Sequence, residues 1–401
     1  MQSDGRSNRV RCTHGLTFRS SFHAILELAS KMHDPTSQSN RLFALDIFRG
    51  ITIFFMIVVN TPGSWSYVYA PLLHAEWNGL TPTDLVFPFF VYIVGCAMSF
   101  SFGKFDQTDS LGPLHVKVLR RTLLIFSVGI FLNGFPFYDR NFADLRVYGV
   151  LQRIALAYGL SALLIMHCRR EWLPCVFGIL LVSYYGMLIG FAGESPLTLE
   201  GNAVRELDLW LLGPQHLYQG YGVPFDPEGL LSTVPTVGTV LFGYWVGLKL
   251  QQPDEVMDKI KALLPYALLP ISLGMVLNFV GCPINKPLWS SSYVLVTGGL
   301  ATLCLGSLLY ILDYRKWRGW ARVFEAFGKN PLFCYVAAAL IAQTLSLIKW
   351  DGVGLYDWAY QNLFQPSFGY YAGSCLQALV YTMLIWGLAW LLYRKDIVIK
   401  L

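Results

Sequence analysis

The sequence has little charge. Asp, Glu, Lys and Arg together make up only 14% of the 401 residues, whereas hydrophobic residues make up 54%. Soluble domains carry about 25% charged residues, so this balance excludes an ordinary soluble protein. The net charge of +5 is modest, and no polar domain carries a basic stripe interleaved with aromatic side chains. Nucleic acid is therefore excluded as a partner.

The sequence also lacks the alternation of apolar and polar residues that marks β-strands. Long apolar segments take its place, and a helix that crosses a bilayer needs roughly 20 mostly apolar residues. We predict an all-α, polytopic membrane bundle of about ten transmembrane helices in contact with membrane lipid. The expected spans are 43–60, 84–102, 118–134, 147–167, 172–191, 231–249, 262–281, 290–312, 331–348 and 374–393.

Residues 1–42 contain no apolar run long enough for the core of a signal peptide. They are polar and carry several basic residues. We interpret them as a disordered cytoplasmic tail, or in part as a result of reading from Met1 rather than Met32. Residues 43–401 then form the transmembrane domain.

Basic residues are distributed unevenly between the two sides of the predicted bundle. If the tail is cytoplasmic, every connection on its side contains Lys or Arg, and such a bias marks the cytoplasmic side. We therefore predict that both termini are cytoplasmic. The opposite side holds only Arg140, Arg146, Arg153, Arg205, Lys286 and Lys349.

Metal-ligand spacing is absent as well. The eight cysteines include no CxxC pair and no Cys/His cluster, so no metal is expected. Two interpretations of the cysteines stay open. They are ordinary thiols, or Cys282 and Cys375, which lie near the outer side, form a disulfide.

The most informative stretch that is present connects the first two apolar segments. It is rich in Tyr and Trp, which gather at the water boundary of membranes. It also contains His74, with Asp84 ten residues later. An imidazole titrates near neutral pH and can act as a general base or a nucleophile. A histidine of the interfacial belt, and a helix-capping role for Asp84 beside Thr83, are the structural alternatives.

Residues 192–230 form a long outer connection. They include acidic, Gly and Pro residues, together with Trp210, Tyr218 and Phe225, which a folded segment can bury. Loops of this length are usually functional or disordered. We predict a cap over the outer mouth of the bundle, in which His216 is an ordinary loop residue.

Polar residues inside apolar spans are costly and usually have a partner or a function. Asp46 and Arg49 are three residues apart, on one helix face, where they can form a salt bridge. Gln152 and Arg153 can line a polar cavity or bond to a neighbouring helix. The GxxxG motif at 243–247 predicts close helix packing.

Six segments carry a resemblance to a known family. Together they resemble the heparan-alpha-glucosaminide N-acetyltransferase family, which comprises the lysosomal transmembrane acetyltransferase and its bacterial relatives. The matches run from Arg41 to about Tyr335, nearly the whole membrane domain. They are RLFALDIFRGITIFFMIVVN, HAEWNGLTPTDLVFPFFVYIVG, GVLQRIAL, FDPEGLLST, NKPLWSSSYVL and GKNPLFCYV.

The resemblance implies a reaction and its residues. The family's active histidine falls on His74 and a functional asparagine on Asn60. The implied reaction moves an acetyl group from cytosolic acetyl-CoA to the amine of a terminal glucosamine on the far side of the membrane. A bacterial inner membrane is the implied location. The sequence contains no counterpart of the lysosomal protein's luminal domain, and the stretch from Asn60 to His74 is longer, so an acceptor as large as heparan sulfate is not implied.

Acyl transfer needs a base or acyl carrier and donors for the oxyanion. We assign the first role to His74, with Asp84 to orient it, and the second to Asn60 and Asn78. Direct attack by the amine is favoured over an acyl-imidazole, which water would hydrolyse unless the loop closes.

The donor site needs polar and cationic groups that can hold a phosphorylated nucleotide. We expect acetyl-CoA to bind Arg49 with Asp46, and Arg153, Gln152 and Asn330. No metal is required for this transfer.

Two other functions stay open. An amino-sugar (N-acetylglucosamine) transporter could use ten helices as two inverted halves, although no internal repeat is visible. A scaffold without chemistry would not explain the polar residues in the spans. A homodimer is compatible with each of these functions.

Overall fold

The computed structural model describes residues 42–102, 111–138, 141–191 and 195–399. The predicted tail, apart from Leu42, and residues 192–194 of the predicted cap lie outside this part. The regular secondary structure of the described residues is helical except for a two-residue antiparallel ladder between β1 (Lys349–Trp350) and β2 (Val353–Gly354). The all-α class is confirmed.

A helix occurs at each of the ten predicted segments. Short helices complete the described chain: α7 (Ala203–Leu212), α11 (Arg322–Lys329), α13 (Leu355–Ala359) and α14 (Gln365–Phe368). The ten are α2 (Phe43–Asn60), α3 (Val86–Phe102), α4 (Gly112–Gly134), α5 (Val150–His167), α6 (Leu173–Gly190), α8 (Thr233–Leu250), α9 (Val256–Phe279), α10 (Ser291–Leu308), α12 (Pro331–Leu347) and α15 (Tyr370–Arg394).

Single turns and π-helical segments lie between or extend these helices. They are η2 (Ala70–Leu72), η3 (Pro82–Leu85), η4 (Phe142–Asp144), η5 (Arg170–Trp172), η6 (Pro214–His216), η8 (Gly319–Ala321) and the π-helical η7 (Leu309–Tyr314) and η9 (Tyr360–Phe364).

Seven helical segments of the described chain are long and apolar enough to cross a membrane, and the protein is therefore an integral membrane protein. They begin at Phe43, Pro82, Val150, Arg170, Val256, Ser291 and Tyr370. A pair of helices that starts at Gly319 and includes α12 is bent by 76° and would be an eighth span. The count of ten spans and the cytoplasmic termini stay predictions.

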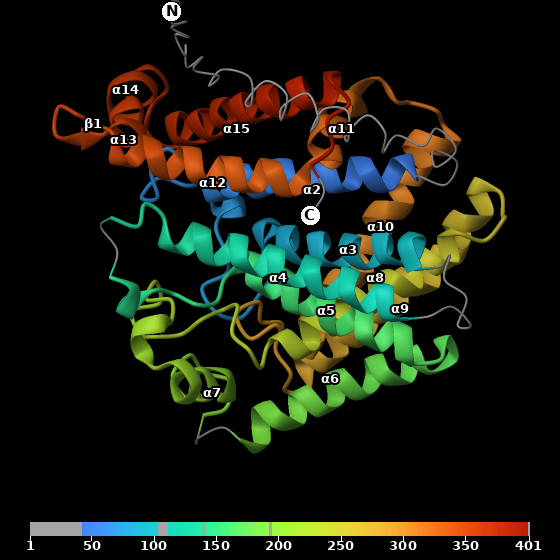
Figure 1. Ribbon diagram of the computed structural model, residues 1–401. Coiled ribbons are helices and arrows are strands. Elements are labelled where there is room, and N and C mark those ends of the chain that lie inside the picture. Colours follow the sequence, from blue (N-terminus) through green and yellow to red (C-terminus); the bar gives the residue numbers. More distant parts are fainter. Residues whose placement is uncertain (1–41, 103–110, 139–140, 192–194, 400–401) are drawn as a thin grey trace, which may run out of the picture. The chain divides into compact units, whose positions relative to one another are not determined.

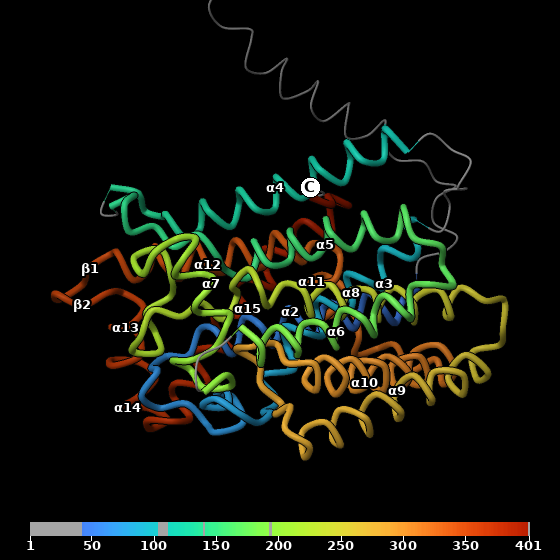
Figure 2. Tube along the Cα trace, turned by 90° about the horizontal axis from the view of Figure 1, so that it is seen from below, coloured from blue at the N-terminus to red at the C-terminus, as the bar shows by residue number. Residues whose placement is uncertain are grey.

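The helices form two bundles. In Figure 1, α2, α12 and α15 lie as a layer above α3, α4, α5, α6 and α8. α9 and α10 run side by side along one edge, as Figure 2 shows. The large bundle, α3 to α10, has its own apolar core, and the small bundle, α2 with α11 to α15, has a second one that includes Ile53, Phe327 and Tyr381.

Glycines let helix backbones approach closely within each bundle. A Cβ on Gly243 would lie 2.1 Å from the Tyr92 carbonyl oxygen, and one on Gly95 would lie 2.0 Å from that of Val240, so α3 and α8 touch backbone to backbone. The close packing predicted from the GxxxG motif is confirmed. Gly50 of α2 similarly meets the Phe324 carbonyl of α11.

All seven cysteines of the described chain are free thiols. Cys96, Cys282 and Cys334 are buried, whereas Cys375 is partly exposed. Cys282 lies near Ser292, with its sulfur 3.7 Å from the Ser292 oxygen. The interpretation as ordinary thiols is therefore confirmed, and the alternative disulfide between Cys282 and Cys375 is wrong.

Candidate functional site

The candidate site lies at the end of the molecule where α2 connects to α3. The connection, residues 61–81, shares this end with α7, the β-ladder, α13 and α14, on the left in Figures 1 and 2. Gly79 turns the chain with a φ of 124°, which residues with a Cβ rarely adopt. The next residues start η3, where the Asp84 carboxylate accepts hydrogen bonds from the Thr81 amide (3.0 Å) and hydroxyl (2.9 Å). The structural alternative for Asp84, a helix cap, is thus present, and it coexists with the contact to His74.

His74 and Asp84 form a defined pair. The His74 Nδ1 atom lies 2.7 Å from Oδ1 of Asp84, and the Asp84 side chain is 1% exposed whereas that of His74 is 50% exposed. The other carboxylate oxygen accepts from the Ala75 amide at 3.1 Å. Because an ionised carboxylate only accepts, Nδ1 carries the imidazole proton and Nε2 keeps its lone pair. The pair therefore holds a half-exposed imidazole in one tautomer and orientation.

Lys286, from the connection between α9 and α10, completes this centre. Its Nζ lies 2.9 Å from Nδ1 and 3.2 Å from Nε2 of His74, and 3.4 Å from Oδ1 of Asp84. Nδ1 already donates to Asp84, so the ammonium can donate only to Nε2 or to the carboxylate. Burial lowers the pKa of Lys286, while the Asp84 charge opposes this shift.

Asn285 ties the His74 segment to the same connection. Its amide nitrogen donates to the Trp77 carbonyl at 3.1 Å and to Oδ1 of Asn78 at 3.0 Å. The Gly79 amide donates to the Ile284 carbonyl at 2.8 Å. Asn78 is therefore next to the centre, but its side-chain oxygen is used to hold the loop.

Arg153 is fully buried and lies close enough to this centre for its charge to act on Lys286. Its guanidinium donates to the Gly229 carbonyl at 3.2 Å and to the Ser232 hydroxyl, and sits 5.1 Å from the Trp289 ring centroid. Trp289 has a φ of 53°, in the left-handed region that non-glycine residues avoid. Nη1 and Nε of Arg153, and Nε2 of the adjacent Gln152, have no hydrogen-bond partner in the described chain.

The cap segment, residues 195–230, packs against this end. Arg146 bonds to Asp226 at 2.8 Å and to Glu228 at 2.6 Å, which joins the segment after α4 to the end of the cap. The Trp77 indole donates to the Leu197 carbonyl at 2.8 Å. Burial, together with the nearby Asp226 charge, raises the pKa of Asp208 to about 7. His216, which we predicted to be an ordinary loop residue, forms a similar link: its Nδ1 bonds to the Leu145 carbonyl at 2.7 Å.

The remaining donor-site candidates lie at the other end of α2. Arg49 bonds to Asp46 at 2.9 Å, which their spacing predicted, and to the Gly328 carbonyl at 3.3 Å. Asn330, two residues later, holds the C-terminal segment through Ile397 and Ile399. The structure therefore brings Asp46, Arg49 and Asn330 to one region and does not bring Arg153 or Gln152 to it.

Asn60 ends α2 and is exposed. It lines a cavity that is formed with the small bundle, and His74 is not among the residues that line this cavity. Within the described chain, no hydrogen bond links the Asn60 side chain to His74 or Asp84.

Sequence reasoning missed Lys286 and Asn285 as parts of the centre. Lys286 and His74 are 212 residues apart in the chain, so no local spacing relates them. A signal was present in the motif NKPLW, which contains both residues and carries part of the family resemblance.

Comparison with known proteins relates this centre to a family. The family model described as "Heparan-alpha-glucosaminide N-acetyltransferase, catalytic" matches residues 41–265, more than half of the chain. This match includes His74, Asp84 and Arg153 and ends before Lys286.

Two curated relatives carry the same name. The heparan-alpha-glucosaminide N-acetyltransferase of Homo sapiens is 28% identical over 355 residues, which cover 74% of this chain and 52% of that protein. The Mus musculus protein is 28% identical over 357 residues, covering 75% and 53%. The chain thus spans about half the length of the curated relatives it matches. With its membrane-spanning helices and the family model's match, the chain belongs to the heparan-alpha-glucosaminide N-acetyltransferase family, as a transmembrane N-acetyltransferase domain.

Proposed function

We propose that the protein transfers an acetyl group from cytosolic acetyl-CoA to the amine of a glucosamine-type sugar on the outer side of the membrane. The observation that carries this proposal is the oriented pair of His74 and Asp84, in which the His74 side chain is 50% exposed and Nε2 faces the Lys286 amino group at 3.2 Å. A bacterial inner membrane suits this arrangement, in which the donor binds from the cytoplasm and the acceptor binds from outside.

In the proposed reaction, the acceptor enters as a free amine beside Nε2. Its nitrogen attacks the thioester carbonyl, and the new N–C bond forms as the nitrogen loses a proton to Nε2. The resulting imidazolium is stabilised by the buried Asp84 carboxylate. The C–S bond then breaks, and the departing thiolate takes the proton. His74 therefore begins and ends each cycle with the same tautomer.

Lys286 supports this chemistry through its ammonium, 3.2 Å from Nε2. In the proposed reaction the acceptor amine replaces it beside Nε2, and the ammonium donates to the oxyanion as the carbonyl carbon becomes tetrahedral. In this proposal Lys286 takes the oxyanion role that the sequence suggested for Asn78, because the Asn78 side chain holds Asn285.

The proposed donor path starts at the end of α2 that contains Asp46 and Arg49. Arg49 and Asn60 are separated by roughly 16 Å of helix rise. Acetyl-CoA therefore has to extend along the interface of the two bundles, with its nucleotide near Arg49 and Asn330 and its thioester at His74. Arg153 and Gln152 are then positioned for the acetyl end rather than the nucleotide.

The proposal is tested with purified protein in detergent, labelled acetyl-CoA and glucosamine. N-acetylglucosamine should form, and Arg49→Ala should weaken CoA binding measured by calorimetry. Unchanged CoA binding would leave Arg49 as only the salt-bridge partner of Asp46.

A transporter would behave differently in the same preparation. Reconstituted vesicles without acetyl-CoA would take up amino sugar, and His74→Ala would alter that uptake. Donor-independent uptake that depends on His74, with no acetylated product, would overturn the acetyltransferase proposal.

A further inference from the structure

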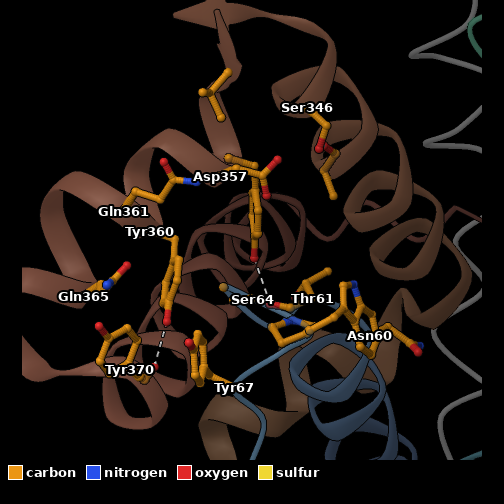
Figure 3. Close-up of a pocket in the computed structure, with 16 residues that line it drawn as sticks. Asn60, Thr61, Ser64, Tyr67, Ser346, Asp357, Tyr360, Gln361, Gln365 and Tyr370 are labelled. Carbon is orange, nitrogen blue, oxygen red and sulfur yellow. Dashed lines mark hydrogen bonds between the residues drawn. The ribbon is translucent and has the colours of Figure 1, made fainter. Parts of the chain in front are cut away.

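A cavity of about 700 Å³ opens beside the first part of the α2–α3 connection. Its wall comes from residues 60–67 on one side and from α12, β2, α13, η9 and the start of α15 on the other. Figure 3 shows the side chains that surround it. We refer to it as the tyrosine cavity, because Tyr67, Tyr356, Tyr360 and Tyr370 line it.

The tyrosine rings are held in place. Tyr356 donates its hydroxyl to the Thr61 carbonyl at 2.7 Å, and Tyr360 donates to the Tyr370 carbonyl at 3.0 Å, the two dashed lines of Figure 3. The ring centroids of Tyr67 and Tyr370 are 4.6 Å apart. Fixed aromatic rings provide apolar faces for a ligand at little entropic cost.

Three polar side chains line the same cavity without a partner of their own. Asp357, Gln361 and Gln365 follow one another at four-residue intervals through α13, η9 and α14. Within the described chain, none of the three side chains makes a hydrogen bond or an ion pair. The π-helical η9 lies in this run, and such segments are frequent at functional sites. The cavity thus offers one carboxylate and two amides to a ligand.

This combination matches a saccharide. A sugar ring has an apolar C–H face that packs on aromatic rings and a rim of hydroxyls that bond to amides and carboxylates. A purely apolar ligand would displace water from the exposed Asp357 and Gln361 side chains without replacing its hydrogen bonds. A nucleotide or CoA phosphate would lack a counter-charge, because no Lys or Arg is among the described residues that line the cavity.

We propose that the tyrosine cavity is a hexosamine-binding site, in which Asp357 binds the ammonium group of an amino sugar. The choice of sugar rests on the proposed function. Because His74 does not line the cavity, the bound sugar is a second unit of the acceptor and not the one that reacts. The α2–α3 connection joins the two sites, since its first residues line the cavity and His74 lies later in it.

The test measures sugar binding to the full chain in detergent, without acetyl-CoA and in the His74→Ala background, so that no turnover occurs. Saturation-transfer NMR and calorimetry should give a dissociation constant of roughly 1 mM for glucosamine, the range that a ligand of about a dozen heavy atoms reaches. N-acetylglucosamine, which has no ammonium, should bind about tenfold more weakly. A glucosamine disaccharide should bind more tightly than the monosaccharide.

Asp357→Asn should remove the preference for glucosamine over N-acetylglucosamine, and Gln361→Ala should weaken the binding of both sugars. The matched control is Asp254→Asn, an exposed carboxylate between α8 and α9, which should change neither. The proposal is overturned if neither sugar binds, if Asp357→Asn binds like the parent, or if CoA displaces the sugar from the cavity.

These outcomes separate the cavity from the proposed reaction. Sugar binding that depends on Asp357, in a protein that makes no N-acetylglucosamine, would keep the cavity and remove the acetyltransferase proposal. Acetyl transfer to a disaccharide that is unaffected by Asp357→Asn would keep the acetyltransferase proposal and remove the proposed sugar site in the cavity.

Discussion

The two halves of the α2–α3 connection have opposite characters. Residues 74–84 are bound to the large bundle, and the Asp84 carboxylate there is satisfied by His74, Ala75 and Thr81. Residues 61–67 are bound to the small bundle, for example by the Gly63 amide to the Ser374 carbonyl at 3.1 Å. They face a cavity in which the side chains of Asp357, Gln361 and Gln365 have no partner in the described chain.

On the proposed function, this difference separates chemistry from recognition. A reacting centre benefits from groups that are already oriented, because little reorganisation is then needed during the reaction. A binding cavity needs groups that are left for the ligand to satisfy. Residues 74–84 contain groups that are already oriented, and residues 61–67 face groups that are left for a ligand. Changes in the second half should therefore lower turnover, and changes in the first half should lower affinity.

The largest effect is expected for His74→Ala. It removes the proposed base, so acetyl transfer should fall by a factor of roughly 100 or more, while CoA still binds. Steady-state assays with labelled acetyl-CoA measure the loss. His115→Ala, at a histidine that pairs with His167 on other helices, is the control and should retain activity.

Asp84→Asn should come next, with a loss of roughly tenfold or more in kcat, because the carboxylate that orients the proposed base is removed. The amide cannot accept at both positions, so the His74 ring loses its fixed tautomer. KM for the sugar should change little. A rise in KM with an unchanged kcat would place Asp84 outside the chemistry.

Asn285→Ala should lower kcat by about tenfold, because a shift of the His74 segment by a fraction of an ångström misaligns the base. The substitution removes the bonds to Trp77, Asn78 and the Leu288 amide. Kinetics at saturating sugar provide the measurement. Asn362→Ala, which loses only a bond to the Trp358 carbonyl, serves as the control.

Lys286→Arg tests the pH dependence of the centre. Burial lowers the pKa of Lys286, so its charge is present at low pH and is lost, as pH rises, earlier than for a free lysine. If the ammonium is required, wild-type activity declines on the alkaline side as pH passes this pKa. An arginine stays charged throughout, so the variant should lose a few-fold in rate at neutral pH but keep its activity to higher pH. If the pH–activity profiles of the wild type and Lys286→Arg fall off identically on the alkaline side, the charge of Lys286 is not required.

The smallest effect is expected for Ser374→Ala. The Ser374 hydroxyl accepts from the Ser64 amide at 3.0 Å and donates to the Ser64 carbonyl at 3.1 Å, so its loss loosens the first half of the connection. Sugar affinity should fall roughly two- to fivefold with kcat unchanged, since one hydrogen bond contributes about 1 kcal/mol. Cys375→Ala is the neighbouring control. A fall in kcat alone would contradict the division between the two halves.

The local parts of this arrangement could be predicted from the sequence. Helices occur at every predicted span because apolar runs of that length have few alternatives in lipid. His74 and Asp84 are ten residues apart and meet across one turn-rich segment. Asp46 and Arg49 pair because helix geometry puts them on one face.

The rest depends on tertiary structure. Lys286 reaches His74 from a connection 212 residues away, and the tyrosine cavity combines residues near position 60 with residues near 360. Arg153 was grouped with Arg49 by residue type, although buried contacts with Gly229 and Trp289 hold it near the centre. Such contacts are fixed by how the two bundles pack, which no local pattern reports.

The anchoring of the connection also determines which contacts a substitution disturbs. Its first half bonds to Ser374 of α15, and Tyr69 packs on Tyr371 of the same helix. The Pro71 and Leu73 carbonyls instead accept from Thr83 and Thr81, and Asn285 holds Trp77 and Asn78. The surroundings of the tyrosine cavity and those of His74 can therefore be changed separately within one short piece of chain.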